Sequence, residues 1–370
     1  MRTALVPVAL LALGLAAAPA TADRIYTTDG KTITDVKIVE EGLQRITYRE
    51  GRNDRTVDST QVLRVEFEEM PRTLDEAFAS IADGDPDSGI ILLEDYVGGV
   101  LAGKEERRHK WAPAHAAWRV VELKASMGDQ EGAKQAAGIV IDNFADTRYL
   151  PDAYMARAEA AYQLGDAATA QATLKDFQSA IATRGMDERW AIECELALVT
   201  TDDGLTGAKR RGALEKVADK AGSKHGTVRN AALVAIGESY LADLAGSPDR
   251  AGQNVPAALA LFEEVIADPR ASDATLAGAY AGKGDCLFQE AAPAQDTAML
   301  KEALLCYLRV AAVYSEQTRY VPKALFYAGR CLDLMEDDES KDRAQQLYGQ
   351  VYFLYPDSPW AREAANFSRR

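Results

Sequence analysis

Residues 147–153 read Thr-Arg-Tyr-Leu-Pro-Asp-Ala, and residues 318–324 read Thr-Arg-Tyr-Val-Pro-Lys-Ala. Each copy follows a predicted helix that ends near an aromatic residue, and each precedes a new helix. A heptapeptide repeated among alanine-rich amphipathic stretches indicates that one helix-turn-helix unit has been copied along the chain. The pattern therefore predicts a mainly α-helical solenoid, in which each helix pair buries its apolar side against the next.

Further matches lie inside the predicted helix pairs. The segment starting at Gly284 aligns with the segment starting at Gly329 at an offset of 45 residues, and Tyr307 aligns with Tyr348 at an offset of 41. Gly237 begins an earlier copy of the same pattern. We expect these small residues to lie where the two helices of a unit cross, with the bulky residues packed around them.

Gly-Asp dipeptides separate the helices of the early pairs, at residues 84–85, 128–129 and 165–166. Glycine suits the left-handed cap that closes one helix, and aspartate caps the next helix. With these turns and the small crossing residues, the chain from Leu74 to its end resembles the tetratricopeptide repeat family. The loop Tyr355–Trp360 is similar to the subtype common in bacterial envelope proteins. About seven units follow, near residues 73–101, 110–145, 151–183, 187–222, 226–268, 273–314 and 321–355, with residues 361–367 as a terminal cap.

Residues 24–68 alternate between apolar and polar positions, with turn signals at 29–30, 41–42 and 51–53. This pattern predicts about five short antiparallel strands, with a single 3₁₀ turn at 59–61 before the last one. So few residues cannot form a sandwich, and curling into a small barrel removes exposed strand edges. We therefore expect a small SH3-like or Sm-like barrel over residues 23–69 and a helical repeat domain over residues 73–370.

Residues 1–22 have the features of a cleaved signal peptide. Arg2 precedes a short apolar run, and Ala20-Thr21-Ala22 fits a cleavage site. The alternative is an uncleaved N-terminal anchor. No cysteine lies near the predicted cleavage site, the first being Cys194, so we expect no lipid anchor. The predicted location is the periplasm or the medium, without a membrane span.

The chain has 42 Lys and Arg residues against 57 Asp and Glu residues, a formal net charge of −15. Such an excess of carboxylates repels phosphate backbones, which argues against nucleic acid as a partner. A well-solvated acidic helical surface explains the same composition.

Catalytic and metal-binding patterns are weak. Residues 98–104 satisfy most of a phosphate-loop pattern, but Glu105 stands where Ser or Thr should hold magnesium, and a helix rather than a strand precedes the segment. The three histidines have no partners at zinc-ligand spacing. We therefore predict a non-enzymatic protein with no cofactor and no metal.

The cysteines allow a structural hypothesis for an exported chain. In the repeat register, Cys331 faces the preceding helix, which carries Cys306, so a bridge between these two is the preferred pairing if one forms. The alternative is that Cys286, Cys306 and Cys331 are small apolar residues of the core.

The resemblance implies that the first helix of each unit lines a concave face that holds a peptide or partner helix. The positions that match are His115, Trp118, Glu122, Met155, Glu159, Tyr162, Asp285, Phe288, Phe326 and Arg330. His115 and Trp118 lie near Trp111 and could form an aromatic patch, although core or surface packing is the favoured interpretation of these residues. The leading hypothesis is a periplasmic scaffold or adaptor that binds another envelope protein or peptide. The alternatives are a cell-wall glycan-binding module and an envelope enzyme.

Overall fold

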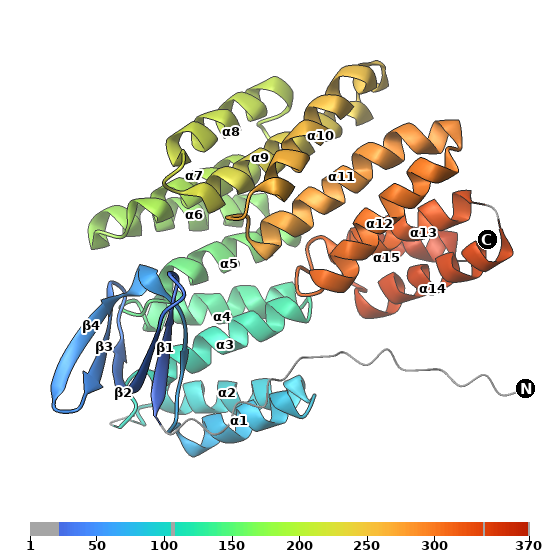
Figure 1. Ribbon diagram of the computed structural model, residues 1–370. Coiled ribbons are helices and arrows are strands. Elements are labelled where there is room, and N and C mark those ends of the chain that lie inside the picture. Colours follow the sequence, from blue (N-terminus) through green and yellow to red (C-terminus); the bar gives the residue numbers. More distant parts are fainter. Residues whose placement is uncertain (1–21, 105–107, 336, 369–370) are drawn as a thin grey trace, which may run out of the picture. The chain divides into compact units, whose positions relative to one another are not determined.

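The structure is a computed structural model that describes residues 22–104, 108–335 and 337–368. The predicted signal peptide lies outside these residues except for Ala22. Within the described residues, five β-strands come first and fifteen α-helices follow (Figure 1). The prediction of a mainly α chain with an N-terminal antiparallel sheet is confirmed.

The described chain divides into two compact units. The first unit contains the residues up to Leu123 together with Gln135–Ala153. The second contains Lys124–Lys134 and the chain from Tyr154 onward. The predicted domain boundary near residue 70 stays a prediction. The division into two units does not fall there, because the strands and the helical residues from 72 to 123 belong to the same unit.

The N-terminal sheet is antiparallel, with the strand order β4-β3-β2-β1-β5. Its strands are β1 (Asp23–Thr27), β2 (Thr32–Glu41), β3 (Arg45–Glu50), β4 (Asn53–Asp58) and β5 (Val62–Glu66). The predicted 3₁₀ turn is present at Ser59–Gln61, between β4 and β5. Because β4 and β5 stand at opposite ends of the strand order, closure into a barrel stays a prediction.

The two-residue alternation of the strands places one set of apolar side chains inside. Ile25, Val36, Ile38 and Ile46 are all buried. Asp23 is buried with them, and its carboxylate accepts hydrogen bonds from the backbone N–H groups of Ile38 and Glu68, each 2.7 Å long. The start of β1 is thereby joined to β2 and to the residues that follow β5.

The helices follow the predicted units closely. In chain order the pairs are α1 (Arg72–Ala82) and α2 (Pro86–Leu101), α3 (Ala112–Ser126) and α4 (Gln130–Asn143), α5 (Leu150–Gln163) and α6 (Ala167–Arg184), α7 (Glu188–Thr200) and α8 (Gly207–Ala221), α9 (Gly226–Ala242) and α10 (Ala251–Ala267), α11 (Asp273–Ala294) and α12 (Thr297–Val313), and α13 (Val321–Leu334) and α14 (Asp338–Leu354). A last helix, α15 (Pro359–Phe367), occupies the place of the predicted terminal cap.

The Gly-Asp turns have the predicted roles. Gly84 and Gly165 take left-handed backbone conformations, with φ of 86° and 81°. The aspartate that follows each glycine caps the next helix, because Asp85 Oδ1 accepts a hydrogen bond from Ser88 N at 3.1 Å and Asp166 Oδ1 accepts one from Thr169 N at 2.9 Å. At each of these two turns only three residues separate the end of one helix from the start of its partner.

In the second unit the helices pack as successive pairs. From α7 onward each first helix contacts its own second helix and also the first helix of the next pair, giving the series α7, α9, α11 and α13. The aligned small and bulky residues meet inside the pairs, since a Cβ on Gly284 would lie 2.7 Å from the ring of Tyr307 and one on Gly329 would lie 2.6 Å from the ring of Tyr348. The absence of a side chain at these two positions lets the paired helices approach closely.

Candidate functional site

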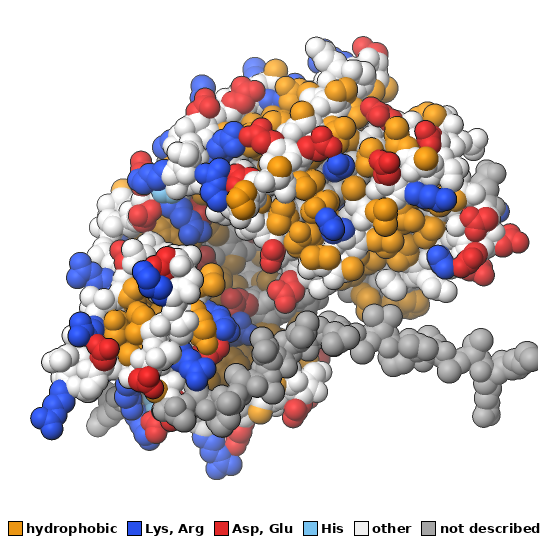
Figure 2. All heavy atoms as spheres, in the orientation of Figure 1, with side chains coloured by type: hydrophobic (Ala, Val, Ile, Leu, Met, Phe, Trp, Pro, Cys, Tyr) orange, Lys and Arg blue, Asp and Glu red, His pale blue; other side chains and the backbone are white. Residues whose placement is uncertain are grey.

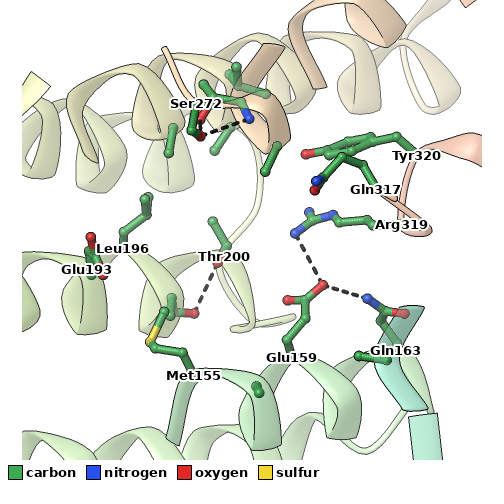
Figure 3. Close-up of a pocket in the computed structure, with 18 of the residues that line it drawn as sticks. Met155, Glu159, Gln163, Glu193, Leu196, Thr200, Ser272, Gln317, Arg319 and Tyr320 are labelled. Atoms are coloured by element: carbon green, nitrogen blue, oxygen red, sulfur yellow. Dashed lines mark hydrogen bonds and ion pairs between the residues drawn. The ribbon is translucent and has the colours of Figure 1, made fainter. Parts of the chain in front are cut away.

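The second unit contains a cavity of about 490 Å³, open to solvent, which we call the α5–α13 cavity. All the residues that line it belong to this unit. Its walls come from the C-terminal end of α3, the start of α4, the first helices α5, α7, α9 and α11, and the loop before α13 (Figure 3). The cavity therefore lies on the face formed by the first helices of successive pairs, which is the face predicted to bind a partner.

Small side chains leave this space open. The first helices that surround it present alanines where longer side chains would fill the hollow. These alanines are Ala156, Ala160, Ala197, Ala231, Ala235 and Ala274. Met155, Leu196 and Val234 add apolar surface. A mostly apolar hollow with a few polar groups is the usual form of a protein binding site.

Charged side chains from distant parts of the chain meet at the cavity. Arg319, in the loop before α13, lies with its Nη1 3.4 Å from Glu159 Oε1 on α5 and its Nη2 3.9 Å from Glu238 Oε2 on α9. Glu159 also accepts a hydrogen bond of 2.9 Å from Gln163 Nε2 (Figure 3). The side chains of Arg319 and Glu159 are 45% and 39% exposed, and ion pairs this exposed contribute at most about 1 kcal/mol.

A third carboxylate lies along the same wall. Glu193 on α7 lies with its Oε1 2.6 Å from Arg189 Nε. Burial raises the pKa of Glu193 above its ordinary value, and Arg189 offsets this only in part. A further positive charge close to Glu193 would therefore favour the ionised form of its carboxyl group.

Arg319 belongs to the second copy of the repeated heptapeptide, and the first copy makes an equivalent contact elsewhere. We call residues 147–149 and 318–320 the first and second Thr-Arg-Tyr loops. In each loop the arginine lies over the ring of the adjacent tyrosine, at 4.6 Å for Arg148 and 5.3 Å for Arg319. In each loop the arginine also pairs with a carboxylate far away in the sequence.

The first Thr-Arg-Tyr loop is a buried anchor within the first unit. Arg148 Nε donates to Glu41 Oε1 at 2.7 Å, and the Tyr149 hydroxyl lies 3.0 and 2.9 Å from the two oxygens of Glu41. The side chains of Glu41 and Arg148 are 1% and 13% exposed. His115 Nδ1 lies 2.8 Å from the Tyr149 hydroxyl. The end of β2 is thereby fixed to the helices of its unit.

The buried carboxylate of Glu41 should make the stability of the first unit depend on pH in the acid range. Burial by itself would raise the pKa of Glu41, but His115, Arg148 and Tyr149 outweigh it and lower the pKa below its ordinary value of 4.5. A lowered pKa means that the stabilisation is complete above pH 4.5 and is lost as the pH falls through the folded-state pKa.

We therefore expect the unfolding free energies of the wild type and Glu41→Gln to converge as the pH is lowered below about 4.5, measured by chemical denaturation at several pH values. Parallel curves for the two proteins would contradict the assignment.

The ten predicted groove residues divide between the cavity and other places. Met155 and Glu159 line the α5–α13 cavity. Tyr162 donates a hydrogen bond to Asp203, and Glu122 pairs with Arg119. His115 and Trp118 lie in an aromatic cluster of the first unit, where Trp118 stacks on Tyr149 and His115 lies edge-on to Phe67. These two side chains therefore pack against other aromatic rings, and a role for them in binding a partner stays a prediction.

The four remaining predicted groove residues lie near the C-terminal helices. Phe288 and Phe326 are buried in the core. Asp285 accepts a hydrogen bond of 2.9 Å from the Tyr307 hydroxyl and pairs with Lys323. Arg330 lies over the ring of Phe367, at 4.3 Å. These four residues hold helices together, and a role for them in binding a partner stays a prediction.

Sequence reasoning did not select Arg319, Glu193 or Glu238. A signal for Arg319 was present, because the second heptapeptide carries the same Arg-Tyr dipeptide as the first. It was used only as evidence of a repeat.

The four cysteines are free thiols in the structure, and a Cys306–Cys331 bridge stays a prediction. Cys194, Cys286 and Cys331 are buried, and Cys306 is partly exposed. Burial raises the pKa of Cys286 and of Cys331 to about 12. Cys286 and Cys331 are therefore small buried side chains of the core, which is the alternative given above for these cysteines.

Neither a metal centre nor a membrane span emerges from the part of the chain that the structure describes. Within it, no group of three or more His, Cys, Asp and Glu side chains is arranged to hold a metal ion. No helix among the same residues is long and apolar enough to cross a membrane.

The stacked helix pairs define a helical-repeat protein. Comparison of the sequence with described families and with curated proteins gives no match. Among solved structures, a tetratricopeptide repeat protein from Parabacteroides merdae is similar, with a TM-score of 0.45 and 11% sequence identity over 80% of this chain and 98% of that one.

Proposed function

We propose that this protein is a non-enzymatic scaffold or adaptor of the bacterial periplasm, and that it holds an extended segment of another envelope protein in the α5–α13 cavity. The observation that carries the proposal is the hollow formed by the first helices of successive pairs. Its volume of about 490 Å³ lies within the range of about 300–1,000 Å³ typical of ligand pockets. The periplasmic location rests on the predicted signal peptide.

The lining favours a peptide over a glycan. Methyl and methylene groups of alanine, methionine, leucine and valine form much of the surface, and Tyr320 is the one aromatic residue among those that line the cavity. Apolar side chains of a peptide fit such a surface, while the polar groups at its edge can fix the orientation of the peptide. Glycan binding remains the second candidate in the test below.

The test places a photo-crosslinking amino acid at Leu196, inside the cavity, in the full chain expressed in its native cell. A matched control places the same amino acid at Ala260, an exposed position on α10. We expect a discrete crosslinked protein from position 196 and none above background from position 260. Adding Ala231→Trp, which fills the cavity, should lower the yield at position 196 by about tenfold or more.

The thermal unfolding of the Ala231→Trp protein is measured beside the wild type, so that loss of binding is separated from loss of fold. Equal crosslinking at both positions, or a yield that Ala231→Trp leaves unchanged in a folded protein, would contradict the proposal. Crosslinking to peptidoglycan instead of protein would favour the glycan alternative.

A further inference from the structure

The α5–α13 cavity has more negative than positive charge on its walls. The charged residues that line it are four carboxylates, Glu159, Glu193, Glu238 and Glu316, and one cation, Arg319. Figure 2 shows acidic side chains where α5 and the loop before α13 face each other. Arg189, outside the lining, pairs with Glu193, and Arg319 is shared between Glu159 and Glu238. The four carboxylates still outnumber these two cations, so a neutral or anionic segment would leave an excess of negative charge at the cavity.

Two of these carboxylates already form a site for a cation. Glu159 on α5 and Glu238 on α9 lie close enough that a single guanidinium, that of Arg319, contacts both, at 3.4 and 3.9 Å. The two helices hold the carboxylates in place, while Arg319 approaches from a loop. The loop is held independently of Arg319, because Thr318 Oγ1 donates to the carbonyl oxygen of Ala125 at 3.3 Å. The backbone N–H groups of Tyr320 and Val321 also donate to the carbonyl oxygen of Gln317, at 2.9 and 3.2 Å. The arginine side chain can therefore leave the carboxylates without the loop unfolding.

The two Thr-Arg-Tyr loops differ in how firmly they hold their carboxylates. Arg148 and Glu41 are almost fully buried and share a network with Tyr149. The pair of Arg319 and Glu159 is about two-fifths exposed and longer, and water and salt can compete for it. The first loop suits permanent attachment, and the second suits exchange.

We propose that the segment held in the α5–α13 cavity presents a lysine or arginine side chain, which binds between Glu159 and Glu238 in place of Arg319. This inference rests on the proposed function and specifies the chemistry of the partner. Arg319 then acts as an internal competitor that neutralises the two carboxylates in the empty state. The apolar wall accepts the residues beside the basic one.

The experiment selects peptides from a random dodecapeptide display library on the immobilised full chain. The strongest binder is then synthesised, and its dissociation constants are measured by calorimetry. We expect the selected peptides to be enriched in Lys and Arg over the starting library. Replacing the basic residue of the chosen peptide by Gln should weaken binding by about tenfold.

Two variants test the site in opposite directions. Glu159→Gln with Glu238→Gln should weaken binding of the basic peptide by about tenfold, because its cation loses both carboxylates. Arg319→Gln should strengthen binding by about threefold or more, because the competing cation is removed. The matched control, Glu290→Gln with Glu302→Gln, changes two exposed carboxylates outside the cavity lining and alters the net charge equally, so it should leave the dissociation constant unchanged.

The outcomes separate this inference from the proposed function. Peptides that lose binding on Ala231→Trp but show no basic enrichment, or that bind the Glu159/Glu238 variant as well as the control variant, would overturn the basic-residue inference and leave the cavity as a peptide site. A selection that yields no binder, or binders unaffected by Ala231→Trp, would overturn both.

Discussion

Replacing Glu41 by Gln is expected to lower the free energy of unfolding of the first unit by about 3–5 kcal/mol. The side chain of Glu41 is 1% exposed, and it accepts a hydrogen bond from Arg148 Nε at 2.7 Å. Without the carboxylate, the guanidinium of Arg148 stays buried with no opposite charge, which costs more than the pair itself stabilises. The Tyr149 hydroxyl would also lose a charged acceptor.

The measurement is hydrogen–deuterium exchange resolved by peptide, because it reports the opening of the first unit separately from that of the second. Glu40→Gln is the matched control. Glu40 is the exposed neighbour on the same strand, it carries the same charge, and its replacement should change stability by less than about 0.5 kcal/mol. Similar losses for the two variants would contradict the anchoring role of Glu41.

Much of the fold could be predicted because its signals are local. The Gly-Asp turns mark where one helix ends and the next begins, and both events depend on residues within one turn. The contacts between the two helices of a pair could also be predicted. Gly284 and Tyr307 lie on consecutive helices, and the repeat at Gly329 and Tyr348 indicated that the same contact is made twice.

The sites depend on contacts that leave no local pattern. Glu41 pairs with Arg148, 107 residues away, and Arg319 pairs with Glu159, 160 residues away. In the sequence, Glu41 was interpreted only as part of a turn signal. The groove prediction followed helical periodicity, which does not settle whether a side chain such as Phe288 faces the core or the solvent when both neighbours are helices.

Replacing Gly282 by Val is expected to destabilise the second unit by about 3 kcal/mol. Phe262, on α10, lies between glycines of two first helices. A Cβ on Gly282 of α11 would lie 2.2 Å from its ring, and one on Gly237 of α9 would lie 2.6 Å from it. Phe262 itself is completely buried, so the ring cannot move aside without disturbing the packing of α9, α10 and α11. The free energy of unfolding is measured by urea denaturation.

Gly349→Ala is the control with the opposite expected sign. Gly349 lies within α14, and a Cβ there would meet no atom within 4 Å. Alanine should therefore stabilise the helix by about 0.5–1 kcal/mol, because glycine loses more backbone freedom on folding.

A double substitution tests whether the cost at Gly282 comes from contact with Phe262. If the cost came from backbone conformation instead, replacing the ring by a smaller side chain would not reduce it. We expect Phe262→Ala in the Gly282→Val protein to cost less than it does in the wild type, since the smaller side chain makes room for the valine. Additive costs for the two changes would show that this ring and this glycine do not set the spacing between successive helix pairs.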